Sequence, residues 1–323
     1  MDDATPPDSS SASPTTCVFL VNPASAAGST GKQWPEIAHR AATAGLSGDA
    51  LLSERPGQLG ELARGAVADG ATLLVVVGGD GTVNEVVNGI ADLEEQPEVA
   101  IISRGTGWDF IRTFGIPRKI EDAVEVALRG EIRLVDLGRV SYRAWDGDDA
   151  HAVFANVASA GMSGAAAQRA NATTKVFGGK AAYLWAALAV LARWSPGELR
   201  VTVDTESRTA RMYDVVVANG RYFGGGMEIC PGAACDDGLF DVLTIGDLSK
   251  RDLMLTMPKA YRGKHLPHAK AEVLRGRVVT VDSDEPVPVE LDGEQPGTTP
   301  VRFEVLPGRL KLRVPAKTEQ GTD

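Results

Sequence analysis

The chain has 323 residues, 43% of them apolar, so it is long enough to bury the cores of two domains and is not a disordered protein. Its 43 acidic residues outnumber 33 basic ones, for a formal net charge of −10. That balance argues against broad nucleic-acid binding, which usually needs a basic face. Three cysteines, Cys17, Cys230 and Cys235, lack metal-ligand spacing, and we expect a reducing, cytoplasmic setting.

The ends of the sequence differ in composition from the rest. Residues 1–14 are acidic and rich in Ser, Pro and Thr, without the basic and apolar regions of a signal peptide, and we expect a disordered tail there. Residues 316–323 are expected to form a second tail. The longest apolar run, AAYLWAALAVLARW, has 14 residues, fewer than the roughly 20 that a membrane-spanning helix needs.

Residues 15–134 alternate between apolar runs and helical patterns. We predict strands at CVFLVNP, DALLSE, ATLLVVVGG and PEVAIIS, and helices at WPEIAHRAATAG, GQLGELARGAVADG and GTVNEVVNGIAD. Continuous apolar strands that alternate with helices are typical of a parallel sheet covered on both faces. The pattern therefore predicts a Rossmann-like α/β nucleotide-binding domain, in which ligands bind at the carboxyl ends of the strands.

The stretch VVVGGDGTVNEVVNGI ends one of these strands and begins a helix. Gly78, Gly79 and Gly81 allow positive φ and a close approach of the backbone to a ligand. The helix after Thr82 directs its N–H groups at the loop, as in a phosphate site. Asp80 among phosphates suggests an intervening Mg²⁺ or a base beside the transferred phosphate. An ordinary turn with Asp80 as helix cap is the alternative.

Two further loops follow strands of the same set. NPASAAGSTGK, residues 22–32, lacks the first glycine of a Walker P-loop and has Gln33 in place of Ser or Thr, so it covers phosphates, if at all, only as a flexible loop. SRGTGWDFIRTFGIP, residues 103–117, has a tight glycine turn, and Asp109 is placed to cap the helix that begins there.

Residues 135–315 have a different texture. Short alternating or apolar runs are separated by Gly, Asp and Pro, which predicts a mainly antiparallel β-sandwich or open barrel. The last strand is able to return to the first domain. The exception is GGKAAYLWAALAVLARW, which is apolar on nearly every side and predicts a helix wedged between packed elements.

Together these pieces resemble the catalytic domain of diacylglycerol kinases, in particular the bacterial lipid kinases of that family. Sphingosine and ceramide kinases are relatives, and NAD kinases share the glycine-aspartate loop. The likeness runs from Val18 to Pro315 and includes Asn22-Pro23, GGDGTVNEVVNG, GTGWDFIRTFGIP, FGGGMEICPGAACDDGLFDV, LDGE and FEVLPGRLKLRVP. Two departures stand out. Trp108 occupies the usual position of an Asn, and the first loop reads SAAGSTGK rather than the glycine-richer SGxGxG.

The resemblance implies an ATP-dependent kinase that transfers the γ-phosphoryl group to a lipid hydroxyl, of diacylglycerol or a related lipid, with Mg²⁺ bridging the phosphates. The implied general base is Glu294, because a carboxylate within hydrogen-bond reach can take the proton of a lipid hydroxyl. Asp80 and Asp292 are the other catalytic candidates. The residues expected to hold ATP are Ser53, Gly78, Gly79, Asp80, Gly81, Thr82, Val83, Asn84 and Thr106.

The segment AACDDGLFD crowds three aspartates around a glycine turn. Oxygen ligands in a tight loop suit Mg²⁺ or Ca²⁺, although the residues alone also fit a plain Asp-Gly turn. The resemblance implies a structural Mg²⁺ held by the Asp237 side chain and by the carbonyl groups of Ala234 and Leu239.

The lipid has to come from a membrane surface, yet the protein is acidic. The segment from Lys250 to Arg277 is the exception, with eight Lys or Arg against Asp252 and Glu272, hence +6. It predicts either a solvated face or a reversible contact with anionic lipid. By analogy the apolar helix described above lines a lipid pocket, with Lys180 at its start. We expect no nucleic-acid partner and leave a homodimer open.

Two other functions compete with a lipid kinase. An NAD kinase-like enzyme would share GGDGT, but GTGWDF and LDGE favour the lipid branch. A non-catalytic nucleotide- or lipid-binding protein would be expected to have lost Asp80 or Glu294, and both are present. Incubation with ATP and either NAD or a lipid extract separates these alternatives.

Overall fold

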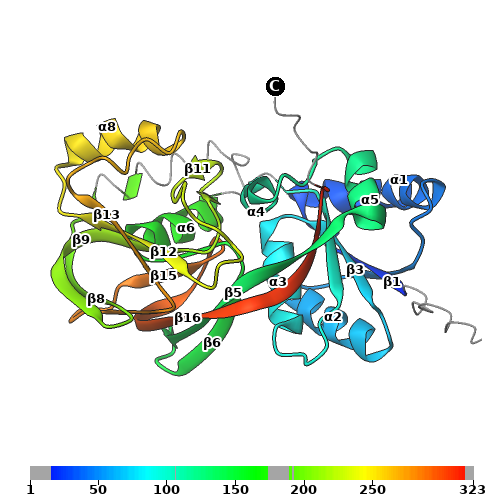
Figure 1. Ribbon diagram of the computed structural model, residues 1–323, viewed down its shortest axis with the longest axis horizontal. Coiled ribbons are helices and arrows are strands. Elements are labelled where there is room, and N and C mark those ends of the chain that lie inside the picture. Colours follow the sequence, from blue (N-terminus) through cyan, green and yellow to red (C-terminus); the bar gives the residue numbers. More distant parts are fainter. Residues whose placement is uncertain (1–15, 106, 174–188, 191–192, 317–323) are drawn as a thin grey trace, which may run out of the picture.

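The computed structural model describes residues 16–105, 107–173, 189–190 and 193–316. Two lobes lie side by side (Figure 1), and two long strands, β5 (Glu131–Ala144) and β16 (Glu294–Val314), run from one lobe into the other. The expected domain boundary at residues 134 and 135 falls inside β5, so the backbone passes between the lobes without a linker. The expected tails at residues 1–14 and 316–323 lie outside the described residues, apart from Ala316.

The first lobe is a parallel sheet in the order β2-β1-β3-β4, flanked by helices. Its strands are β1 (Cys17–Val21), β2 (Asp49–Leu52), β3 (Leu73–Gly78) and β4 (Glu98–Ser103). Its helices are η1 (Ala26–Gly28), α1 (Ser29–Thr43), α2 (Gln58–Ala68), α3 (Asp80–Ile90), α4 (Asp109–Thr113) and α5 (Ile120–Arg129). The predicted α/β domain is confirmed.

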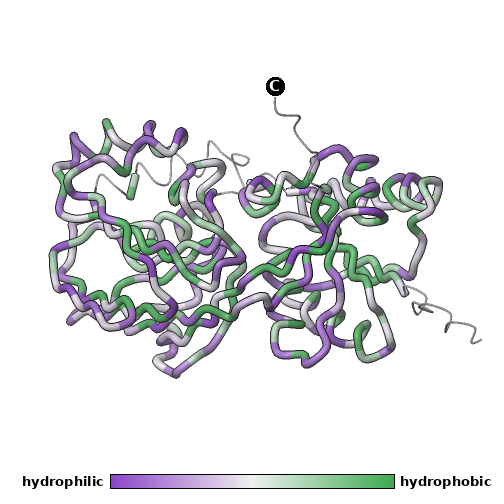
Figure 2. Tube along the Cα trace, viewed as in Figure 1, coloured by the Kyte–Doolittle hydropathy of each residue, from purple (hydrophilic) through white to green (hydrophobic). Residues whose placement is uncertain are grey.

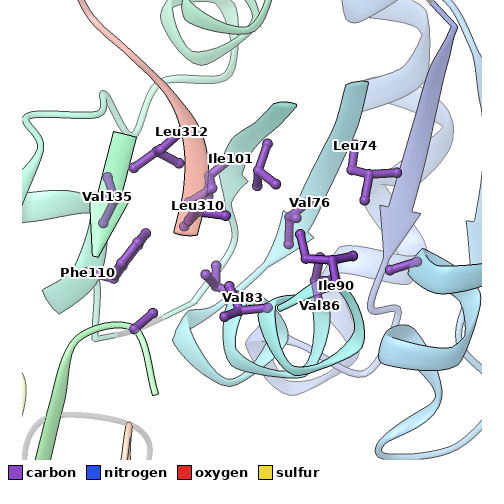
Figure 3. Packing of buried hydrophobic residues seen from close by; sticks show 14 of the residues in the cluster. Leu74, Val76, Val83, Val86, Ile90, Ile101, Phe110, Val135, Leu310 and Leu312 are labelled. Carbon is purple, nitrogen blue, oxygen red and sulfur yellow. The ribbon is translucent and has the colours of Figure 1, made fainter. Parts of the chain in front are cut away.

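The continuous apolar strands are buried because both faces of this sheet are covered. Every residue of β1 and β3 is buried. On one face α2 and α3 pack against the strands, and Figure 3 shows Val83 and Val86 of α3 directed at Val76 and Ile101. On the other face α1 and α5 form a second apolar cluster. Figure 2 shows the result as hydrophobic strands inside and hydrophilic turns outside. This packing fixes α3, and hence the glycine loop at its start.

The second lobe is a β-sandwich whose strands pair antiparallel. Besides β5 and β16 it contains β6 (Asp149–Phe154), β7 (Val157–Gly161), β8 (Gly197–Val203), β9 (Glu206–Ala218), β12 (Phe240–Gly246), β13 (Ala271–Gly276), β14 (Val278–Asp282) and β15 (Pro288–Leu291). Phe154, Phe240 and Phe303 meet inside it. The short pair β10 (Tyr222–Phe223) and β11 (Met227–Glu228) and the helices α6 (Met162–Thr173) and α8 (Lys250–Ala260) complete the lobe.

The last strand joins the two lobes. β16 pairs with β14, β15 and β5 in the sandwich, and its far end lies parallel to β4 in the first sheet, with Lys311 opposite Glu98. The turn before β16 is therefore anchored from both sides. The helix expected at GGKAAYLWAALAVLARW lies almost wholly outside the described residues. Among the helices that are described, none is long and apolar enough to span a bilayer.

Candidate active site between the two lobes

The glycine loop between β3 and α3 and the glycine loop after β4 are each packed too tightly for a side chain at one position. A Cβ on Gly78 would lie 2.3 Å from the Thr82 hydroxyl oxygen, and a Cβ on Gly105 would lie 2.6 Å from Cα of Gly79. The two glycine loops of the lobe thus touch backbone to backbone. No side chain caps the first turn of α3. This leaves the helix start suited to phosphate, as the sequence predicts.

The loop after β1 contacts this helix start. The Asn22 side-chain amide donates to the Thr82 hydroxyl at 3.0 Å, and Ala26 and Ala27 have positive φ angles of 51° and 55°. Ser53 follows β2, and its N–H donates to the Val21 carbonyl at 3.0 Å. These loops end neighbouring strands at one edge of the sheet, so Ser53 and the α3 start border the same space. Thr106 lies outside the described residues, and its expected contact stays a prediction.

Asp80, the first residue of α3, faces the start of α4. Its Oδ1 accepts the Phe110 N–H at 3.4 Å, and a Cβ on Gly107 would lie 2.5 Å from its Oδ2. Burial raises the pKa of Asp80 above its ordinary value, the backbone N–H groups of α4 lower it, and the carboxylate of Asp292 raises it. The carboxylates of the two lobes therefore lie close enough to interact.

Asp292 lies in the Asp-Gly turn between β15 and β16 and joins the lobes. Its carboxylate accepts the backbone N–H groups of Ala155, Asn156 and Val157 at 2.8–3.1 Å. It also accepts the side-chain amide of Asn84, one turn along α3 from Asp80, at 2.9 Å. Four donors occupy this carboxylate, so Asp292 holds the turn in place and is poorly suited to take a proton from a substrate.

Glu294 follows this turn and is exposed. Asp292 and Gly293 adopt positive φ angles of 49° and 97°, the conformation of a two-residue hairpin turn, and Leu291 pairs with Glu294 across it. Desolvation raises the pKa of Glu294, and the nearby Glu85 carboxylate on α3 raises it further. A carboxylate beside α3 with a raised pKa is suited to accept a proton from a hydroxyl group.

Sequence reasoning missed a buried acid behind this turn. Glu290 is fully buried, its carboxylate accepts the Gly293 N–H, and the Ser159 hydroxyl donates to it at 3.1 Å. Burial raises its pKa to about 8. The alternation in VPVELDGE contains the signal, because Glu290 and Asp292 stand on the strand face opposite Val289 and Leu291.

The loop expected to hold a structural ion is organised by arginines. The Asp237 carboxylate pairs with Arg275 and accepts the Leu239 N–H at 3.0 Å, and Asp236 pairs with Arg133 at 2.8 Å. Among the described residues, no three His, Cys, Asp or Glu side chains gather closely enough to hold a metal. The described side chains therefore do not assemble an ion site on their own. A Mg²⁺ on Asp237 and the Ala234 and Leu239 carbonyls stays a prediction.

Trp108 is occupied within its own lobe. Its indole N–H donates to the Gly105 carbonyl, the Arg118 guanidinium lies over its ring, and the ring packs against the core of the first lobe. Its positive φ of 60° makes it the left-handed residue before α4. The next residue, Asp109, accepts the Gly225 N–H of the second lobe at 2.7 Å. Trp108 thus helps to fix a turn at the domain contact.

An apolar pocket, with an empty volume of about 870 Å³ that includes its open mouth, lies in the second lobe. Its walls come from α6, β9, β12, α8 and the segment 261–271. Nearly all of its lining is hydrophobic, with Asp214 and His265 among the few exceptions. Such a space suits the apolar part of a ligand whose polar end is elsewhere.

Comparison with known proteins agrees with this geometry. The diacylglycerol kinase catalytic domain matches residues 16–140, and the YegS C-terminal NAD kinase beta sandwich-like domain matches residues 156–314. Taken together, the two matches make the chain similar to the diacylglycerol kinase family over most of its length. The first match ends within β5, one of the two strands that link the lobes.

Individual family members resemble the chain over most of its length. A diacylglycerol kinase of Staphylococcus carnosus is 27% identical over 297 residues, 92% of this chain and 94% of its own. A putative diacylglycerol kinase of Bacillus anthracis has a similar structure, with a TM-score of 0.76, 25% identity and coverage of 94% of this chain and 98% of that chain. Yeast NADH kinase complexed with NADH shares the fold at 14% identity and a TM-score of 0.56, with coverage of 99% and 90%.

Proposed function

We propose that this protein is an ATP-dependent lipid kinase that transfers the γ-phosphoryl group of ATP to a lipid hydroxyl, with diacylglycerol as the first candidate. The observation that carries the proposal is the 2.9 Å hydrogen bond between Asn84 and Asp292. It joins the helix that begins at the glycine loop to the turn that presents Glu294. Phosphoryl transfer depends mainly on such positioning and on charge neutralisation.

Each group has a distinct role in this mechanism. The glycine loop and the start of α3 bind the ATP phosphates, and Asp80 lies beside the phosphoryl group that moves. Glu294 takes the proton of the lipid hydroxyl as the O–P bond forms. Asp292 acts through Glu294, because it fixes the turn that carries it. Bound with ATP, Mg²⁺ would supply neutralisation of the phosphate charge.

The apolar pocket supports a lipid rather than a nucleotide as the acceptor. Its lining is mostly hydrophobic, and burial of a hydrocarbon chain there is favourable. NAD kinase activity is the second candidate, because yeast NADH kinase shares the fold. Initial rates with ATP and either dispersed diacylglycerol or NAD decide between them. Turnover of NAD alone would reject the lipid assignment.

The outer face of α8 supports uptake of that lipid from an anionic membrane surface. Leu253 and Met257 line the pocket from the inner face of the helix, whereas Met254 and Leu255 are 58% and 60% exposed. Figure 1 shows α8 at the edge of the second lobe, and Figure 2 shows hydrophobic and hydrophilic residues mixed along it. The helix and the segment after it carry exposed basic residues, namely Lys250, Arg251, Lys259, Arg262 and Lys264.

Vesicle binding tests this membrane contact without any reaction. The variant Met254→Gln/Leu255→Gln should bind phosphatidylglycerol-containing vesicles roughly tenfold or more weakly than wild type, because two apolar side chains no longer enter the interface. Ile132→Gln/Leu134→Gln is the matched control, since these residues of β5 are 50% and 55% exposed. Equal losses in both variants would contradict a specific role for α8.

A further inference from the structure

The apolar pocket contains two buried polar atoms that have no hydrogen-bond partner among the described residues. Asp214 is 1% exposed, and its Oδ1 makes no hydrogen bond in the structure. His265 is 5% exposed, and its Nδ1 likewise has none. Both residues line the pocket. A buried polar atom without a partner is costly, so two of them in one apolar pocket indicate that a ligand group meets them.

Above about pH 7 both atoms are hydrogen-bond acceptors, because burial raises the pKa of Asp214 to about 7 and its carboxyl is ionised above that value. The other Asp214 oxygen, Oδ2, accepts the Ser163 N–H at 3.0 Å and the Ser163 hydroxyl, which leaves Oδ1 as an acceptor. His265 faces the Ile229 carbonyl with Nε2 at 3.0 Å, so Nε2 carries the proton and Nδ1 accepts. Burial lowers the pKa of His265, which favours this neutral form. The pocket is therefore complementary to a donor.

The backbone leaves the Asp214 oxygen uncovered. Gly161 has a φ of 140°, and a Cβ at that position would lie 2.7 Å from Oδ1. Any residue with a side chain would occupy the space that a ligand atom needs. Because Gly161 has no side chain, the Asp214 Oδ1 atom stays uncovered on the side that faces β7.

The hydroxyl that reacts is too far away to satisfy this acceptor. β7 lies between β15 and β9, so Asp214 of β9 is two strands away from β15. On β7, Ser159 faces Glu290 of β15 on one side and Val216 of β9 on the other, and Gly161 faces Asp214. With strands about 4.8 Å apart and a rise of about 3.3 Å per residue, Asp214 lies roughly 16 Å from Asp292. An extended hydrocarbon chain of about a dozen methylene groups covers that distance.

We propose that the pocket holds a lipid chain with a second hydrogen-bond donor, a hydroxyl or an amine, where the chain passes Asp214 and His265. This inference rests on the proposed lipid kinase function and narrows its substrate class. A chain with only ester carbonyls and methylene groups, as in a plain diacylglycerol, would leave both acceptors unpaired, so the inference favours a related lipid over diacylglycerol itself. A chain with a donor part-way along it would be selected for that reason.

Binding of matched alcohols, without ATP, tests the proposal. The probes are octadecan-1-ol, octadecane-1,12-diol and 12-aminooctadecan-1-ol, measured by displacement of a fluorescent fatty acid. We expect the two probes with a second donor to bind about 10- to 100-fold more tightly than octadecan-1-ol. The difference between the hydroxyl and the amine identifies which donor the pocket prefers. Octadecane-1,2-diol, with its second donor at the wrong position, should show no such gain.

The variant Asp214→Asn should remove most of the advantage. The remaining side-chain oxygen of the Asn keeps the hydrogen bonds from Ser163. The amide NH₂ group then takes the place of Oδ1 and faces the donor of the probe, with which it cannot form a hydrogen bond. Thr256→Val, another change of a polar residue in the same pocket, should leave the preference unchanged. Equal affinity for all probes in the wild type, or an equal gain from the 1,2-diol, overturns the proposal. Preferential binding without phosphorylation would instead count against the kinase function.

Discussion

Asp292 and Glu294 are separated by one residue, yet the structure assigns them different roles that substitution can distinguish. Asp292→Asn keeps one acceptor oxygen and turns the other into an NH₂ group. That group would face two of the four donors that Asp292 accepts, which come from Asn84 and from the backbone of residues 155–157. The variant therefore loses about two hydrogen bonds to a charged group.

The expected cost follows from these contacts. A hydrogen bond to a charged group contributes about 1.5–3 kcal/mol, and Asp292 is partly exposed, so we expect a loss of about 2–4 kcal/mol in the free energy of unfolding. For a protein of this size that lowers the melting temperature by roughly 3–6 °C. Asp284→Asn, at an exposed position before β15, is the control and should change the midpoint little.

Glu294→Gln should have the opposite profile. It keeps the size of the side chain and should melt near wild type, but the rate should fall about 10²–10⁴-fold because the proton acceptor is lost. The pKa of Glu294 is raised, so the wild-type rate should fall as pH drops through a value above the ordinary one for Glu. This loss of rate at low pH, the acid limb of the pH profile, should be absent in Glu294→Gln. It should remain in Asp292→Asn, whose overall rate should be lower than that of the wild type.

The assay is steady-state phosphorylation of diacylglycerol in detergent micelles between pH 5 and 9, beside thermal melts of each variant. An acid limb that disappears in Asp292→Asn but persists in Glu294→Gln would move the base to Asp292. A normal melting temperature in Asp292→Asn would refute its role in holding the turn.

Three further changes test other parts of the structure. Asp80→Asn should abolish turnover while circular dichroism stays normal, and near-wild-type turnover would remove Asp80 from the mechanism. Asp214 and Glu290 have pKa values raised to about 7 and 8, so the folded state holds protons that the unfolded state has lost above about pH 4. The free energy of unfolding should therefore fall as pH rises from 5 to 8, and it should fall less steeply in the variant Asp214→Asn/Glu290→Gln. Parallel curves of stability against pH for the wild type and the variant would contradict the raised pKa values. Asp237→Ala should lower the melting temperature because Arg275 loses one of its two carboxylate partners. A fall of the wild-type melting temperature in EDTA that the variant does not show would reveal an ion on that loop.

Local patterns were sufficient to predict much of the first lobe. The apolar runs of β1 and β3 and the glycines at 78 and 79 are written in consecutive residues, and their physical consequences are local. The pairing of LDGE with α3 was accessible only through the resemblance. It depends on a contact between Asn84 and Asp292, which are 208 residues apart in sequence, and no periodicity encodes it.

Other features depend on three-dimensional packing and could not be predicted from the sequence. Asp214 looks like an ordinary strand residue in ARMYDVVVANG, and only the fold shows that it is buried beside a pocket with one oxygen unpaired. Trp108 is a second example, because nothing in the sequence around it indicates that Arg118, ten positions later, lies over its ring.

The central claim is that the glycine loop and the LDGE turn form one site for phosphoryl transfer to a lipid. The most direct test incubates the protein with γ-labelled ATP and a total lipid extract and identifies the labelled products by mass spectrometry. The account predicts a labelled phosphate monoester of a lipid alcohol, formed by the wild type and not by Asp80→Asn or Glu294→Gln. Label found only in inorganic phosphate or in NADP, or formed equally by all three proteins, would contradict it.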